Sequence, residues 1–151
     1  MINLLIVFVA QYAFLISIFV LVVFGLKVDS QTRKRLIILT LLSFILSYVL
    51  AKVSALFIYD PRPFVTQHLQ PLFPHAPDNG FPSDHTLLST AIASVVFAFN
   101  KRWGVFLFVL ALAIGLARVL AHVHQPLDII GSVVIAVSMT WIASLVLEKK
   151  L

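Results

Sequence analysis

The chain has 151 residues, a length that suits one domain, and we treat residues 1–151 as a single domain. It is 61% hydrophobic and 11% charged, with a mean hydropathy of +1.06, which excludes an ordinary soluble protein. The lack of cysteine excludes disulfides and thiolate metal sites. The net charge of +5 would suit nucleic acid, but the basic residues form no contiguous patch along the chain. We therefore expect an integral membrane protein that binds no nucleic acid.

Five apolar segments follow one another and predict an all-α, polytopic membrane helix bundle of about five transmembrane helices. They cover residues 4–26, 36–59, 86–100, 103–117 and 129–147. A spanning helix needs about 20 apolar residues, so the first, second and fifth are long enough alone. The third and fourth reach that length only with their polar flanks. No basic residue precedes Lys27, and the first segment is too long for a signal peptide, so we expect a retained transmembrane helix.

The basic residues fall mainly in alternate connections between these segments. Eight of the eleven lie in 27–35, in 100–102, and in the C-terminal tail as Lys149 and Lys150. Cytoplasmic connections of membrane proteins are enriched in Lys and Arg, so these three are predicted to be cytoplasmic. The N-terminus and the other two connections then face outward.

The connection 60–82 is long and carries six of the seven prolines. Long loops without secondary structure are often functional, and we expect this one to lie over the outer mouth of the bundle. Within it, Asp60 and Asp78 are predicted turn residues, and His68 and His75 are predicted surface residues.

Ionisable side chains gather in three groups on the outward side. The groups are Lys52 with Asp60-Pro-Arg62-Pro, then Phe81-Pro-Ser83-Asp84-His85, then the stretch from Arg118 through His124 to Asp128. Charged groups at membrane depth are costly, so they indicate function. Arginine binds anions, histidine can attack or move a proton, and aspartate can orient a histidine. Together they indicate chemistry on a phosphate at a membrane surface.

The three groups resemble the signatures of the type 2 phosphatidic acid phosphatase superfamily, usually written K-x6-R-P, P-S-G-H and S-R-x5-H-x3-D. The resemblance spans 52–128, and the third signature matches in spacing from Arg118 through His124 to Asp128. The sequences 60–64 and 80–86 are most similar to bacterial undecaprenyl-diphosphatases of the bacitracin-resistance type. The family implies a helical membrane core, a hydrolase activity on lipid phosphates, and a place in cell-wall biogenesis and antibiotic resistance.

Three positions depart from those signatures. Ala117 replaces the serine before the arginine, and Asp84 replaces the glycine of P-S-G-H. We expect Asp84 to cap the third helix rather than to contact a phosphate. Lys52 lies three residues before the expected position, which is nearly the same helical face but about 4.5 Å deeper. Its side chain can extend over that distance.

The residue chemistry and the resemblance assign the same roles. We expect His124 to attack phosphorus and form a phosphohistidine, with Asp128 accepting the proton of its other ring nitrogen. His85 is the expected general acid for the leaving group. The expected phosphate-binding residues are Arg118, Arg62, Ser83 and Lys52. Asp128 can also cap the fifth helix, and His122 is expected to point away from His124.

A metal site is an alternative, because His85, His122, His124, Asp84 and Asp128 are ligand types. The nearby cationic side chains would repel a divalent ion and attract an anion, so we expect no metal and no other cofactor.

The sequence therefore predicts a metal-independent phosphatase that converts undecaprenyl diphosphate to undecaprenyl phosphate. Its expected place is the bacterial cytoplasmic membrane, with the site on the outer side. The substrate follows from the resemblance, and phosphatidate, phosphatidylglycerol phosphate and lipid A remain alternatives. From another class, a small multipass transporter or lipid-binding protein remains open. A transporter would place its charges near the bilayer midplane, whereas these lie at helix ends.

Overall fold

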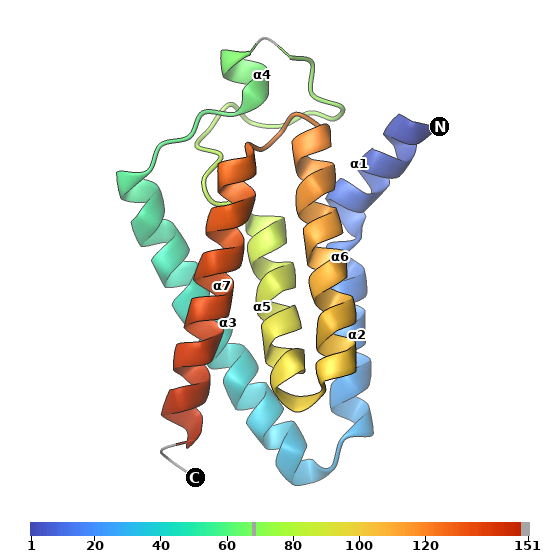
Figure 1. Ribbon diagram of the computed structural model, residues 1–151, viewed down its shortest axis with the longest axis vertical. Coiled ribbons are helices and arrows are strands. Elements are labelled where there is room, and N and C mark those ends of the chain that lie inside the picture. Colours follow the sequence, from blue (N-terminus) through green and yellow to red (C-terminus); the bar gives the residue numbers. More distant parts are fainter. Residues whose placement is uncertain (68, 149–151) are drawn as a thin grey trace.

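The computed structural model describes residues 1–67 and 69–148, and these fold into helices joined by short turns and one long loop (Figure 1). The helices are α1 (Ile2–Tyr12), α2 (Phe14–Lys27), α3 (Ser30–Phe57), α4 (Pro63–Thr66), α5 (Asp84–Phe99), α6 (Lys101–Leu120) and α7 (Pro126–Glu148). In the described residues the only strand-like pairing is an isolated bridge between Pro61 and Asn79. The predicted all-α bundle is confirmed. Lys149, Lys150 and His68 lie outside the described residues.

Three helices, α3, α6 and α7, are individually long and apolar enough to cross a membrane. The pair α1 and α2 forms a fourth candidate span, bent by 47°. The third predicted segment, 86–100, corresponds to α5, which is apolar but has only 16 residues. Large hydrophobic side chains such as Ile38, Val109 and Val134 are exposed on the surface of the bundle, as expected of helices that face lipid. The chain is a membrane protein of about five helical segments.

The transmembrane segment predicted over 4–26 is present as the bent pair α1 and α2, and the bend itself was not predicted. Neither proline nor glycine lies at the break, where Ile16 N–H donates to the Ala13 carbonyl (3.0 Å). The carbonyl of Ala10, one turn before α2, instead accepts a hydrogen bond from Arg118 Nη1 (3.3 Å). A side chain that takes a carbonyl of the helical ladder is a known cause of a kink. The bend therefore depends on a tertiary contact that no local pattern could reveal.

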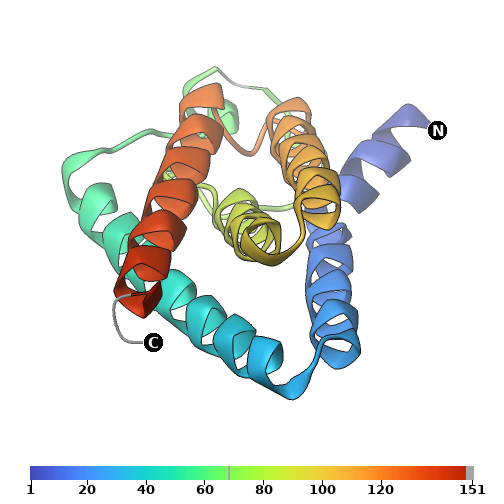
Figure 2. The same ribbon diagram turned by 60° about the horizontal axis from the view of Figure 1, so that its bottom comes forward.

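The short helix α5 forms the centre of the bundle, with α2, α3, α6 and α7 around it (Figure 2). Ten of its sixteen residues are buried, and six of those ten are Ser, Thr or Ala. Small side chains let neighbouring helix backbones approach closely, and this is how helices associate where lipid offers no hydrophobic driving force. The N-terminus of α5 is thereby held at a fixed depth within the surrounding helices.

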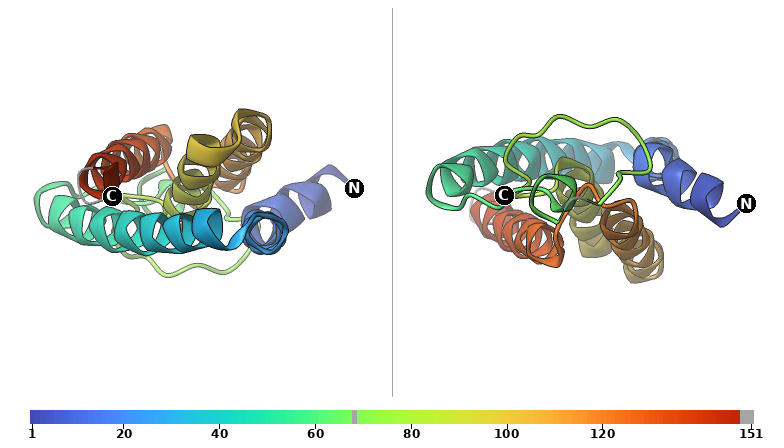
Figure 3. Two further views of the ribbon diagram at one scale, coloured as in Figure 1. Left: turned by 90° about the horizontal axis from the view of Figure 1, so that it is seen from below. Right: turned by 90° about the horizontal axis from the view of Figure 1, so that it is seen from above.

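The helices alternate in direction, so two sets of connections gather at opposite ends (Figure 1). One end carries the loop between α3 and α5 and the turn between α6 and α7, with the N-terminus nearby. The other carries the basic connections α2–α3 and α5–α6. Seen along the bundle, the long loop passes over the mouth of the first end (Figure 3). The expectation that this loop covers the mouth is confirmed, and the three predicted groups of ionisable residues meet at this end of the bundle.

Candidate active site

The pair His124 and Asp128 forms the floor of the site, at the turn that leads into α7. Asp128 is the third residue of α7, and its Oδ2 accepts the backbone N–H of Gln125 (2.8 Å), which caps the helix start. The same oxygen lies 3.0 Å from Nδ1 of His124. Both side chains are buried, at 2% and 0% exposure. The capping and the histidine contact predicted for Asp128 thus occur together.

The other ring nitrogen of His124, Nε2, faces two arginines that are distant in sequence. Nε2 lies 3.3 Å from Nη1 of Arg62 and 3.2 Å from Nη2 of Arg118. Guanidinium groups only donate, and Asp128 as a carboxylate only accepts. The network therefore assigns the proton to Nδ1 and leaves the lone pair on Nε2, directed between the two arginines. An anion bound by both arginines would lie directly in front of that lone pair.

The environment keeps His124 neutral. Burial, followed by the positive charges of Arg118 and Arg62, lowers the pKa of His124 to about 2. A neutral imidazole with its lone pair directed at an anion site has the form a nucleophile needs.

Each arginine is fixed by further partners. Arg62 Nε pairs with Asp78 Oδ1 (2.8 Å), and its Nη1 donates to the carbonyl of Val123 (2.6 Å). Arg118 donates through Nη1 to Ala10, and its Nη2 lies 3.1 Å from Nε2 of His75. Among the described residues, Nε of Arg118 has no partner although it is buried. A buried donor of this kind can bind an acceptor oxygen of a ligand.

The two arginines and His124 line a cavity of about 320 Å³ at the mouth of the bundle. Its lining residues are Ala51, Lys52, Ala55, Arg62, His75, Asp78, Asn79, Phe81, Pro82, Asp84, His85, Arg118 and His124. His85, in the first turn of α5, contributes from the opposite helix, and its ring packs edge-on against Phe14 (4.9 Å between centroids). Two arginines and a lysine against two acidic side chains leave the wall positively charged, which suits an anion.

Two predicted phosphate-binding residues, Lys52 and Ser83, differ in how they relate to the cavity. Lys52 lines the cavity from α3, with its Nζ over the ring of Tyr48 (5.2 Å). Ser83 is fully buried beneath the cavity wall, and its hydroxyl accepts a hydrogen bond from Thr86 (3.2 Å). Lys52 therefore lines the cavity while its Nζ lies over Tyr48. Ser83 is not among the residues that line the cavity, and its hydroxyl contacts Thr86 of α5 instead.

Two predictions about neighbouring residues were wrong. Asp84 does not cap α5: Ser83 occupies the capping position, and Asp84 is the first residue of the helix. His75 is not a surface residue, because it is half-buried and contacts Arg118. The proline-rich sequence around it predicted only a loop, and no local signal marked this histidine. His122, as predicted, points away, with Nδ1 2.9 Å from the carbonyl of Gln70.

Asn79 and Gly80 connect the long loop to the end of α3. The side-chain oxygen of Asn79 accepts the backbone N–H groups of Asp60 and Phe81 (both 3.0 Å), and its amide donates to Ile58 (2.8 Å). Gly80 N–H donates to the carbonyl of Asp60 (2.8 Å). This brings Asp60 close to Asp128, and burial followed by that neighbouring carboxylate raises the pKa of Asp60. Asp60 and Asp78 are therefore more than turn residues.

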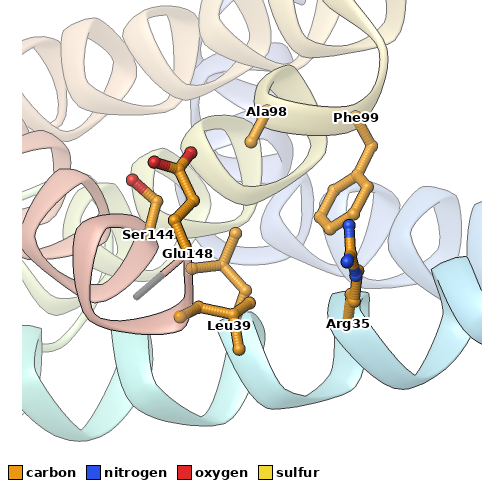
Figure 4. Close-up of a pocket in the computed structure, with 7 residues that line it drawn as sticks. Arg35, Leu39, Ala98, Phe99, Ser144 and Glu148 are labelled. Atoms are coloured by element: carbon orange, nitrogen blue, oxygen red, sulfur yellow. The ribbon is translucent and has the colours of Figure 1, made fainter. Parts of the chain in front are cut away.

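A second cavity, about 460 Å³, lies at the opposite, basic end between α3, α5 and α7 (Figure 4). Arg35 extends beside the ring of Phe99, and Ser144 and Glu148 project from α7. It contains no histidine, and it pairs one arginine with one carboxylate. The residues that suit phosphate chemistry are therefore confined to the mouth end.

Fold and cavity together define a class: a helical membrane protein with a cationic cavity and a buried histidine–aspartate pair, suited to binding and transferring a phosphoryl group. The chain matches the PAP2 superfamily over residues 36–151 and belongs to that superfamily. The sequence resemblance is thereby confirmed. As a member with phosphatase relatives, the chain is a lipid phosphatase, a hydrolase.

Individual relatives agree with this assignment. The chain is 33% identical over 138 residues to the bacitracin transport permease protein BcrC of Bacillus licheniformis, covering 91% of this chain and 68% of that protein. It is 32% identical over 134 residues to the undecaprenyl-diphosphatase BcrC of Bacillus subtilis, covering 87% and 67%. The crystal structure of Aquifex aeolicus LpxE matches with a TM-score of 0.76 and 30% identity, covering 93% of this chain and 85% of that one.

Proposed function

We propose that this protein hydrolyses undecaprenyl diphosphate to undecaprenyl phosphate and phosphate through a phosphohistidine on His124. The observation that carries the proposal is the position of His124, whose Nε2 faces Arg62 and Arg118 while Nδ1 contacts Asp128. The substrate is supported by the relative from Bacillus subtilis, which is named an undecaprenyl-diphosphatase. Other lipid phosphates form the second candidate within the class.

In the first step, the terminal phosphate replaces Nε2 of His124 as the partner of Arg62 and Arg118, and its oxygens accept hydrogen bonds from the two guanidinium groups. Bidentate guanidinium contacts fix a phosphate in position and offset its charge. The lone pair of Nε2 then attacks phosphorus, and the bond to the bridging oxygen breaks. Asp128 stabilises the positive charge that develops on the imidazole, because it already accepts Nδ1–H.

The leaving group is the lipid monophosphate, and its bridging oxygen needs a proton. His85 also lines the cavity. As an imidazolium, which the negative charge of the bound diphosphate favours, it supplies that proton and becomes neutral. In the second step, neutral His85 removes a proton from a water molecule that attacks the phosphohistidine. The P–N bond breaks, inorganic phosphate leaves, and both histidines return to their starting forms.

An apolar groove of about 580 Å³ between α3 and α5 offers a place for the lipid chain. It is lined by Phe44, Ile45, Ser47, Tyr48, Lys52, Asp84, Leu87 and Leu88. Lys52 and Asp84 also line the catalytic cavity, so the groove adjoins the cavity directly. A diphosphate in the cavity would thus leave its isoprenoid chain facing apolar side chains and the bilayer.

The orientation follows from the distribution of charge. Eight of the eleven basic residues fall in connections opposite the cavity by the predicted topology. By the positive-inside rule, this distribution supports a cavity on the outer side of a bacterial cytoplasmic membrane. A reporter fused to the C-terminus should be cytoplasmic, and an external C-terminus would contradict this orientation.

The test of function is phosphate release from a panel of lipids by detergent-purified protein in excess EDTA. The panel contains undecaprenyl diphosphate, phosphatidate, phosphatidylglycerol phosphate and lipid A. We expect the highest kcat/KM for undecaprenyl diphosphate. A higher value for a monophosphate would favour the second candidate, and loss of all activity in EDTA would contradict the metal-independent mechanism.

The nucleophile is tested by His124→Ala with His122→Asn as the matched control. His122 lies two residues away, contacts Gln70 outside the cavity, and has a positive φ that asparagine tolerates. We expect His124→Ala to release no phosphate above background and His122→Asn to remain active. Appreciable turnover by His124→Ala would rule out this nucleophile.

A further inference from the structure

The loop over the catalytic cavity places a third histidine next to the proposed phosphate site. His75 lines the cavity, and its ring lies 6.2 Å from that of His124, edge-on at 78°. Its Nε2 is 3.1 Å from Nη2 of Arg118. That same nitrogen of Arg118 lies 3.2 Å from Nε2 of His124, so two imidazoles share one guanidinium nitrogen.

The chemistry of this contact defines the form of His75. A guanidinium nitrogen has only protons to offer, so Nε2 of His75 is the acceptor and the ring is neutral. Its Nδ1 lies 3.4 Å from the carbonyl of Ala76, which can accept a hydrogen bond from Nδ1–H. Burial, followed by the charges of Arg62 and Arg118, lowers the pKa of His75, in agreement with the neutral form. The other titratable neighbours of His75 are Asp78 in the same loop, His124 in the α6–α7 turn and His85 on α5.

The loop holds His75 in place through contacts on both sides of it. Leu72 N–H donates to the carbonyl of Ala121 at the end of α6 (3.1 Å). Phe73 is buried against α1 and the α6–α7 turn, and the Arg118 guanidinium lies over its ring (5.7 Å). On the other side, Asp78 pairs with Arg62. The imidazole is therefore a fixed acceptor and not a mobile side chain that happens to lie near Arg118.

We propose that His75 is a positioning residue of the phosphate site, which holds the Arg118 guanidinium in its binding orientation through a neutral acceptor nitrogen. When a phosphate oxygen replaces His124 as a partner of Nη2, His75 keeps the second proton of that nitrogen. Arg118 then meets the phosphate without having to reorient. The inference rests on the proposed function and adds a residue from outside the three signatures.

The experiment compares His75→Ala, His75→Gln and His75→Lys in phosphate release from undecaprenyl diphosphate and in binding of inorganic phosphate by calorimetry. Glutamine places an amide oxygen near the position of Nε2 and restores the acceptor, whereas lysine offers only donors and a like charge. We expect His75→Ala to raise KM and the phosphate Kd about tenfold with kcat within about twofold, the signature of lost binding. His75→Gln should recover most of the affinity, and His75→Lys should bind more weakly than His75→Ala.

The control is His122→Asn, which removes another loop contact outside the cavity. Unchanged KM and Kd in His75→Ala, or equal losses in the alanine and glutamine variants, would overturn the proposal. If His75→Ala fails to fold, the proposal is tested by the other two variants alone. Equal phosphate Kd values for His75→Gln and His75→Lys would then overturn it. An inactive wild-type protein that still binds phosphate in a His75-dependent manner would contradict the proposed function and leave the role of His75 supported.

Discussion

Nδ1 of His124 and Oδ2 of Asp128 lie 3.0 Å apart, and the same oxygen also caps the start of α7. The backbone of α7 therefore sets the position of the carboxylate, and the carboxylate sets the tautomer of the imidazole. A helix cap and a catalytic orientation thus depend on one oxygen atom.

Replacing this carboxylate should separate the two functions. Asp128→Asn keeps the shape and an acceptor oxygen but removes the charge that stabilises a positive imidazole. We expect kcat to fall at least about a hundredfold, with the phosphate Kd changed less than about threefold, since both arginines remain. Steady-state phosphate release and phosphate calorimetry measure the two quantities. Asp84→Asn is the control, because Asp84 lines the cavity without contacting His124, and equal losses in the two variants would contradict the assignment.

Gly80 lies against this carboxylate, and its lack of a side chain is required by space. A Cβ atom at Gly80 would lie 2.8 Å from Asp128 Oδ2 and 3.0 Å from the Asp60 carbonyl. We expect Gly80→Ala to displace the carboxylate from His124 and lower kcat about tenfold or more. Gly25→Ala is the control, since its Cβ would meet only the end of the Leu36 side chain at 3.3 Å. A Gly80→Ala enzyme with wild-type kcat would show that the carboxylate need not be fixed there.

Lys52 and Arg118 differ in how closely they approach the proposed phosphate site. Arg118 is 3% exposed and contacts His124, whereas Lys52 is exposed on α3 and lies over Tyr48. We expect Arg118→Ala to lower kcat/KM by a factor at least about ten larger than Lys52→Ala does. Rates with undecaprenyl diphosphate measured below KM give this ratio. The reverse order would mean that Lys52 is the closer phosphate ligand.

The neutral state of His124 predicts a pH dependence of stability. Its pKa is lowered from 6.5 to about 2 in the folded protein, mainly by burial and then by Arg118 and Arg62. Below pH 6.5 the unfolded chain therefore binds a proton that the folded chain does not, and stability falls as the pH decreases. Melting temperatures in detergent should fall between pH 7 and pH 5, and less so in His124→Gln. Equal slopes in both proteins would mean that His124 is protonated in the folded state.

How much of the molecule was predictable from sequence can be judged from particular residues. Apolar segments long enough for a bilayer predicted the helices, because a single segment in lipid satisfies its own backbone hydrogen bonds only as a helix. Spacing within 118–128 predicted the contact of His124 with Asp128. In the structure His124 lies in the turn before α7, and the carboxylate reaches back over the helix start to contact it. Tertiary contacts determined the break after Tyr12 and the burial of His75, and both involve Arg118 from α6.

The sequence by itself determined the class of protein and the residues with the chemistry, since hydropathy and local spacing are properties of neighbouring positions. Only the tertiary structure decided which groups meet at Nε2 of His124, because Arg62 is 62 residues away from it. It also decided that a loop histidine and Asp78 hold the two arginines. Such partnerships follow from packing three-dimensional elements around α5, and no periodicity along the chain records them.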